Sequence, residues 1–203
     1  MNKLTLPLFS ALALSLASSS VFAADGQITI NGVVTDETCT LTGTGPGTSG
    51  SAGNLTLTLD TVPKSTFTAP NSFAARKSFS LQLKNAAGTA GCDAATNKSL
   101  KGLYLETAAP ATDLDTANKT LLVNKAAGAN ATEPAFVQIL TDTDIAVDLS
   151  ASAVNQLKSA VTGLAADGTG IATMIYKAQY FSKTGTVAAQ NVSAIVNYTL
   201  QYN

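Results

Sequence analysis

The sequence predicts an all-β sandwich, and three observations lead to that prediction. Short segments alternate apolar and polar residues with a period of two, which buries one face of a strand and leaves the other wet. Val, Ile, Thr, Tyr and Phe fill these segments, as strands prefer. Gly, Pro and Asn gather between them, as is typical of the turns in a sandwich. The expected strands are 27–38, 55–59, 79–83, 103–105, 121–123, 136–140, 171–182 and 192–202.

Residues 1–23 have the pattern of a secretory signal peptide. Lys3 gives a basic start, residues 4–17 form a short apolar stretch, and residues 21–23 (Val-Phe-Ala) suit a cleavage position. A membrane anchor is the alternative, but the apolar run is short for a span of about 20 residues and a run of serines follows it. The length then suits a single mature domain, residues 24–203.

Long amphipathic strands are expected at both ends of the mature chain. The residues on one face of the first are Ile28, Ile30, Gly32 and Val34, and those of the last are Val196, Tyr198, Leu200 and Tyr202. Neither run contains the Pro or Lys that commonly blunts a sheet edge, and an open edge recruits another chain. The pattern therefore predicts a protein that pairs strands with copies of itself.

Two segments between these strands carry separate predictions. Residues 42–53 are rich in Gly, Ser and Thr but lack the Gly-Lys-Ser/Thr ending of a phosphate-binding loop, so we expect a flexible surface loop. Residues 151–164 place apolar side chains at helical spacing, which predicts a short helix, with a long loop as the alternative. The apolar residues of this stripe are Val154, Leu157, Val161 and Leu164.

Cys39 and Cys92 are the two cysteines of the chain. Export places them in an oxidising compartment, where an even pair most simply forms one disulfide. A redox or metal role is the rival interpretation, and the chain has neither a CxxC motif nor a His to support it. The bridge would close a loop of about 53 residues, for which the chain-entropy relation gives roughly 4 kcal/mol.

The composition argues against catalysis and against nucleic acid. Without His, no Ser–His or Cys–His pair and no imidazole metal ligand can form, so we expect no enzyme, no metal and no cofactor. The acidic pairs Asp113/Asp115 and Asp142/Asp144 are interpreted as solvated loop acids. A net charge of −1 lacks the basic surface that nucleic acid requires. Charged residues make up 12% of the chain, about half the usual share, which suits surface hidden in an assembly.

The two ends also resemble a known family. Residues 26–39 read Gly-Gln-Ile-Thr-Ile-Asn-Gly-Val-Val-Thr-Asp-Glu-Thr-Cys, and residues 196–203 form an alternating tail with a penultimate Tyr. Residues 136–139 (Phe-Val-Gln-Ile) and 177–181 (Lys-Ala-Gln-Tyr-Phe) resemble the late strands of the same family, in the same order. Together these segments make the chain similar to the pilin subunits of chaperone–usher (type 1-like) fimbriae.

This resemblance implies an immunoglobulin-like β-sandwich that lacks its final strand and is completed by a donor strand from the neighbouring subunit. Residues 24–35 would be the donor segment, with Ile28, Ile30, Gly32 and Val34 entering the neighbour's groove. The groove would be lined by Val196, Tyr198, Leu200 and Tyr202, and the carboxylate of Asn203 would anchor a chaperone. The disulfide would tie the first strand to the end of the 79–83 strand.

The implied function is that of a structural subunit that polymerises into the pilus shaft, for surface adhesion and biofilm. The implied partners are like subunits, a periplasmic chaperone, an outer-membrane usher, and a tip adhesin or minor pilins, with export through the periplasm to the cell surface. A tip adhesin itself would need a second, lectin domain. The alternative from another class is a free-standing secreted β-sandwich binding module, for example one that binds carbohydrate.

Overall fold

The computed structural model describes residues 39–51 and 53–203. The chain divides into two units, 1–31 and 32–203, and every described residue belongs to the second. The expected signal peptide, the strand expected at 27–38 and the donor segment 24–35 therefore lie outside the described residues, so all three stay predictions.

Strands dominate the described residues, which form an all-β, immunoglobulin-like fold, as predicted. The first five strands are β1 (Thr40–Thr44), β2 (Thr48–Ser51), β3 (Asn54–Leu57), β4 (Ser72–Lys84) and β5 (Leu100–Glu106). The other five are β6 (Leu121–Leu122), β7 (Phe136–Thr141), β8 (Thr162–Leu164), β9 (Gly170–Ser182) and β10 (Asn197–Tyr202). A 3₁₀ turn, η1, spans Lys64–Thr66.

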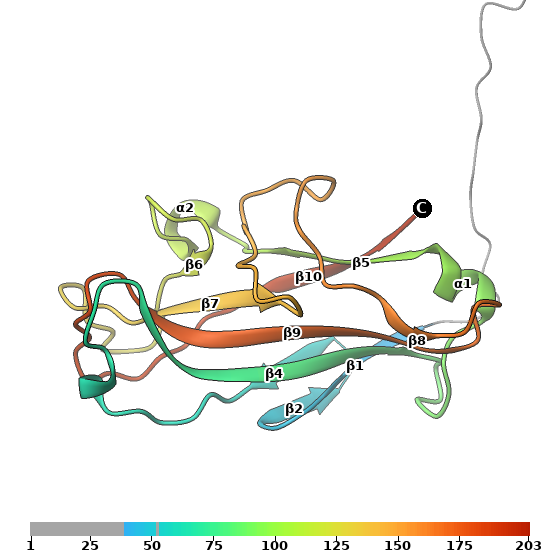
Figure 1. Ribbon diagram of the computed structural model, residues 1–203, viewed down its shortest axis with the longest axis horizontal. Coiled ribbons are helices and arrows are strands. Elements are labelled where there is room, and N and C mark those ends of the chain that lie inside the picture. The colour runs from blue at the N-terminus through green and yellow to red at the C-terminus, as the bar shows by residue number, and fades with distance from the viewer. Residues whose placement is uncertain (1–38, 52) are drawn as a thin grey trace, which may run out of the picture. The chain divides into compact units, whose positions relative to one another are not determined.

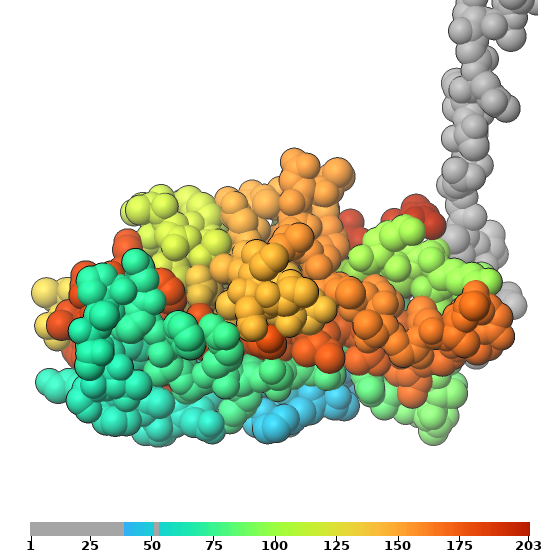
Figure 2. Space-filling view, in the orientation of Figure 1, coloured from blue at the N-terminus to red at the C-terminus, as the bar shows by residue number. Residues whose placement is uncertain are grey.

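The strands form two facing sheets and one hairpin, and all their pairings are antiparallel. The larger sheet has the order β1-β4-β9-β7-β6, with β8 paired to β9. β10 pairs with β5 in a second, two-stranded sheet, and β2 pairs with β3 in the hairpin. Figure 1 shows β5 and β10 running beside each other, above the long strands β4 and β9 in this view. Figure 2 shows one face of the molecule, where the gold and orange segment after β7 packs over the larger sheet.

The main core lies between the two sheets. Leu83 of β4, Leu103 of β5 and Met174 of β9 are fully buried in it. Tyr176 of β9 fills the same core, and its ring stacks on Phe79 with centroids 6.3 Å apart. Burying such side chains stabilises the fold by about 1.5–3 kcal/mol each, so the contact between the sheets is the main source of stability.

Two short helices were not predicted from the sequence. α1 (Ala94–Ser99) begins at Asp93, whose carboxylate accepts hydrogen bonds from the backbone N–H groups of Ala95 and Thr96, as in a standard N-cap. α2 (Pro110–Asp113) starts with a proline, which suits the first helical position. Both are too short to show a helical apolar period, so only their caps could have revealed them.

The prediction of a flexible loop at 42–53 is wrong. These residues contain the end of β1, all of β2 and the turn into β3. Gly47 and Gly50 adopt φ angles of 76° and 101°, a region that glycine occupies without the steric penalty of a side chain. Gly47 lies in the turn before β2, whereas Gly50 lies within β2 and pairs with Leu55, so this glycine-rich run forms a turn and a strand and not a flexible loop.

The expected helix at 151–164 is also wrong. Only one turn forms there, in which the N–H groups of Asn155 and Gln156 donate to the carbonyl of Ser152, and the segment ends in β8. Of the apolar stripe, Val161 and Leu164 are half-buried against the main core, whereas Val154 is 92% exposed. Gln156 is buried in its place, because its amide bonds the backbone of Leu105.

A groove between two strand walls

One wall of a groove is formed by residues 192–200, and we call it the C-terminal wall. Its side chains alternate strictly between half-buried and exposed positions. The half-buried ones are Val192, Ala194, Val196, Tyr198 and Leu200. β5 pairs with residues 197–202, and Lys125 donates its backbone N–H to the carbonyl of Ser193 at 2.8 Å. Within the described residues, no strand pairs with the other edge of β10.

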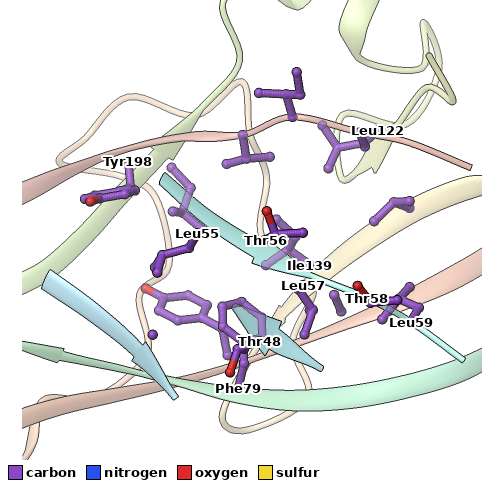
Figure 3. Close-up of a pocket in the computed structure, with 18 of the residues that line it drawn as sticks. Thr48, Leu55, Thr56, Leu57, Thr58, Leu59, Phe79, Leu122, Ile139 and Tyr198 are labelled. Carbon is purple, nitrogen blue, oxygen red and sulfur yellow. The ribbon is translucent and has the colours of Figure 1, made fainter. Parts of the chain in front are cut away.

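The opposite wall is formed by residues 55–59, and we call it the leucine wall. Leu55, Leu57 and Leu59 are half-buried, and the two threonines between them are exposed. Figure 3 shows these leucines and Tyr198 lining the same space, together with Phe79 and Ile139. The groove thus has an alternating apolar strand on each side.

The leucine wall is held by polar contacts at its outer side. The N–H of Thr58 donates to the carbonyl of Gly47 at 2.8 Å. The Lys77 ammonium donates to the carbonyl of Thr58 at 3.0 Å and to a carboxylate oxygen of Asp60 at 2.6 Å. A β-bulge in β4, between Ala74 and Lys77, lies immediately before this lysine. A bulge re-aims side chains, so this local irregularity positions the wall.

The floor of the groove comes from the core between the sheets. It is lined by Phe79, Leu81, Leu105, Leu122, Val137, Ile139, Tyr176, Ala178 and Tyr180. The cavity between floor and walls has a volume of about 1070 Å³. This exceeds the roughly 300–1,000 Å³ of ordinary small-molecule sites. Its size and its walls suit an extended peptide better than a compact ligand.

The floor of the groove is apolar, and the two buried phenols on it stay uncharged. Burial raises the pKa of Tyr176 above its ordinary value of 10.0, against an opposing hydrogen bond to the backbone of Ser159. Burial also raises the pKa of Tyr180, with a further contribution from the Asp60 carboxylate. Both phenols are therefore neutral at physiological pH, and an apolar side chain entering the groove meets no charge on its floor.

The residues predicted for the last strand divide into two sets. Val196 and Tyr198 line the groove, and Leu200 packs against the main core. Tyr202 lies beyond a register shift after Gln201 and is 42% exposed. The backbone N–H of Asn203 donates to the carbonyl of Ser99 at 3.1 Å, which fixes the end of the chain beside α1.

The predicted disulfide between Cys39 and Cys92 is confirmed. The two sulfur atoms are 2.09 Å apart and the Cα atoms 6.0 Å apart. Cys92 is buried, and it belongs to the main core. The bridge holds the start of β1 against the segment between β4 and α1.

Sequence reasoning missed the leucine wall and the floor. The strict Leu-Thr-Leu-Thr-Leu alternation of residues 55–59 did reveal a strand, but nothing local shows that this strand faces residues 192–200. In residues 39–51 and 53–203, no cluster of three His, Cys, Asp or Glu side chains could hold a metal. The helices within that part of the chain are all too short or too polar to cross a membrane.

Comparison with known proteins identifies the class. The chain is 30% identical to the F17 fimbrial protein of Escherichia coli over 188 residues, which cover 92% of each protein. It is also 30% identical to the major fimbrial subunit SMF-1 of Stenotrophomonas maltophilia (strain K279a) over 191 residues, or 94% of this chain and 99% of that protein. No protein-family model matches the chain.

An all-β fold with an open groove, together with these full-length similarities, defines a fimbrial structural subunit. The chain belongs to the chaperone–usher fimbrial subunit family, as the sequence resemblance predicted. Both relatives are fimbrial proteins, so they do not favour a free-standing binding module.

Proposed function

We propose that the chain polymerises by donor-strand exchange to build a pilus shaft for surface adhesion and biofilm. Residues 24–35 of one copy enter the groove of the next and lie between the C-terminal wall and the leucine wall. The observation that carries this proposal is the groove itself, because both walls alternate apolar side chains with the period of an extended strand. Strand addition of this kind uses backbone bonds for affinity and side-chain pockets for register.

The donor segment has the matching pattern. Ile28, Ile30 and Val34 recur at even spacing, and Gly32 interrupts them on the same face. Burying each of the three larger side chains contributes about 1.5–3 kcal/mol. Each backbone bond to a wall adds roughly 0.5–1.5 kcal/mol. Dissociation would uncover the whole groove at once, so fimbriae of this chain should resist detergent and moderate heat.

An unfilled groove also requires protection before assembly. A periplasmic chaperone would cover the groove and hold the C-terminal carboxylate of Asn203, and an outer-membrane usher would then pass subunits to the cell surface. A tip adhesin or minor pilins would complete the fimbria. The role of the chain in this scheme is structural and involves no catalysis.

Two engineered chains test the proposal. The open chain consists of residues 36–203 and lacks the donor segment. The self-complemented chain adds a flexible linker and residues 24–35 after Asn203. We expect the open chain to join no fibre, and the self-complemented chain to be a monomer with a much higher free energy of unfolding, measured by urea denaturation.

A matched control carries Ile28→Ser and Ile30→Ser in the appended segment, which keeps its length and backbone. This control should unfold like the open chain, because the apolar contacts are gone. Donor-strand exchange is not the mechanism if the open chain still forms fibres and the appended segment adds no stability.

A further inference from the structure

Strand β5 has two edges, and they differ in what they contact. One edge pairs with β10 from Leu100 to Glu106. Within the described residues, no strand pairs with the other edge. An exposed edge of this length would accept a strand from another copy as readily as the groove does.

The side-chain amide of Gln156 occupies that second edge. Its Oε1 accepts a hydrogen bond from the N–H of Leu105 at 2.7 Å, and its Nε2 donates to the carbonyl of Leu105 at 2.7 Å. A carboxamide carries the same donor and acceptor as a peptide group. Gln156 therefore satisfies the backbone N–H and carbonyl of Leu105 as a neighbouring strand would, without extending the sheet.

The amide is held firmly in this position. Gln156 is only 4% exposed, and its Nε2 makes a second hydrogen bond to the carbonyl of Asp148 at 3.0 Å. The Asp148 carboxylate in turn accepts from the N–H and the hydroxyl of Ser150. Two residues further on, the stem of Lys158 lies against Gly102 of β5. The segment thus covers β5 at Leu105 and at Gly102.

Burying this amide has a cost in apolar contact. Its neighbours Val154 and Leu157 are 92% and 47% exposed, although either could have packed against the core if the segment were arranged differently. The chain buries a polar side chain and exposes two apolar ones. Such an arrangement is expected where a feature limits partner choice in addition to contributing stability.

We propose that Gln156 caps the second edge of β5, so that a strand from another copy is accepted between the two groove walls and refused beside β5. This inference rests on the proposed strand-addition function and goes beyond it, because it names the residue that confines addition to one place. Chains joined at both places would branch, whereas chains joined at one place form a linear fibre.

Assembled fibres provide the test, because their grooves are already filled. Fimbriae of the full chain are sheared from cells and incubated with a labelled peptide of residues 24–35, and bound peptide is counted per subunit. Wild-type fibres should bind almost none. Gln156→Met keeps the side-chain length but removes both hydrogen bonds to Leu105 and the one to Asp148. Its fibres should therefore bind up to about one peptide per subunit and show branches in electron micrographs.

Asn155→Met is the matched control, since Asn155 is the exposed neighbour, and its fibres should behave like wild type. If Gln156→Met fails to assemble, Gln156→Glu retains the acceptor for the N–H of Leu105 and should bind an intermediate amount of peptide. Hydrogen exchange at the Leu105 amide shows whether the edge has opened. Fast exchange without peptide binding would overturn the edge-cap proposal. Peptide binding by wild-type fibres at one per subunit would instead show that the grooves are empty, which contradicts the proposed function itself.

Discussion

The inner face of β9 and the C-terminal wall have the same period-2 pattern, but they differ in how completely it is buried. On β9, Ala172, Met174 and Tyr176 are at most 1% exposed. On the wall, the corresponding inward residues, such as Val196 and Tyr198, are only half-buried, although they pack against the same core. The alternation alone therefore does not say whether a strand is already covered. Under the proposed function, the half-buried face of the wall is the one that the donor strand of the next subunit covers.

The comparison separates substitutions into two groups. A change in the closed core should alter the open and the self-complemented chain equally, because both contain that core. A change in a groove wall should lower the free energy of unfolding mainly in the self-complemented chain, because only there is the wall covered. Comparing the free energy of unfolding of the two chains therefore tests whether a residue belongs to the closed core or to the groove.

The disulfide should give the largest effect, and it should belong to the closed core. Cys39→Ser releases a bridge that spans 53 residues in sequence, and the chain-entropy relation gives a loss of about 4 kcal/mol. Because Cys92 is buried in the main core, the loss of stability should be the same in the open and the self-complemented chain. Urea denaturation measures it. A loss confined to the self-complemented chain would place the bridge in the function of the groove.

Two apolar truncations should differ in how their loss of stability compares between the open and the self-complemented chain. Leu103→Ala empties a fully buried site and should cost about 3 kcal/mol in both. Val196→Ala should cost about 1.6 kcal/mol in the self-complemented chain, at about 0.8 kcal/mol per buried methylene, and clearly less in the open chain. Ile195→Ala, on the exposed side of the same wall, is the control and should be nearly neutral. Equal losses for Val196→Ala in both chains would mean that nothing covers the wall.

The sequence was sufficient to predict the fold class and most strands, for a physical reason. The late strands at 136–140 and 171–182 follow β7 and β9 closely, because long alternating runs of β-branched and aromatic residues have few other stable arrangements. The segment at 192–196 shows the limit of this reasoning. Its alternation is that of a strand, but it belongs to no ladder within the described residues.

The groove could be predicted only in part, because its walls come from segments more than 130 residues apart. Val196 and Tyr198 were found from the C-terminal pattern, whereas Leu55 and Leu57 were assigned only to an ordinary strand. Gln156 was missed altogether, because a local apolar stripe predicted a helix there. What decided that segment was a long-range hydrogen bond to β5, and no local pattern contains that information.

Gly32 offers a sharper test of how the groove fits its donor. Glycine weakens a strand, so its predicted place on the inward face of the donor segment, between Ile30 and Val34, would mark a close backbone approach. In the self-complemented chain, Gly32→Leu should cost about 1–3 kcal/mol through overpacking. In the full chain, it should slow or block fibre growth, as followed by electron microscopy, without changing the stability of the subunit. Asn31→Leu, on the opposite face, is the control, and equal effects of the two changes would contradict the predicted register.

The smallest expected effect concerns an ion pair on the outer side of the larger sheet. The Lys183 ammonium lies 2.9 Å from Oδ2 of Asp115, and the backbone N–H groups of Ala117 and Asn118 also donate to this carboxylate. Burial by itself would raise the pKa of Asp115. The hydrogen bonds from Lys183 and Asn118 outweigh burial and hold the pKa below its ordinary value of 3.8.

A lowered pKa in the folded state fixes the direction of the pH effect. The ionised carboxylate stabilises the fold above pH 3.8, and this contribution is lost as the pH falls through the lower pKa of the folded state. Asp115→Asn keeps a side-chain acceptor for the turn but removes the charge, so it should cost roughly 1 kcal/mol or less at pH 7, because Lys183 is partly exposed. The variant and the parent should converge in stability as the pH falls below the lowered pKa of Asp115, as measured by urea denaturation across the acid range. Since neither residue lines the groove, the convergence should be identical in the open and the self-complemented chain. A difference between the two chains would show that filling the groove changes the opposite side of the larger sheet. The closed core and the groove would then not be independent.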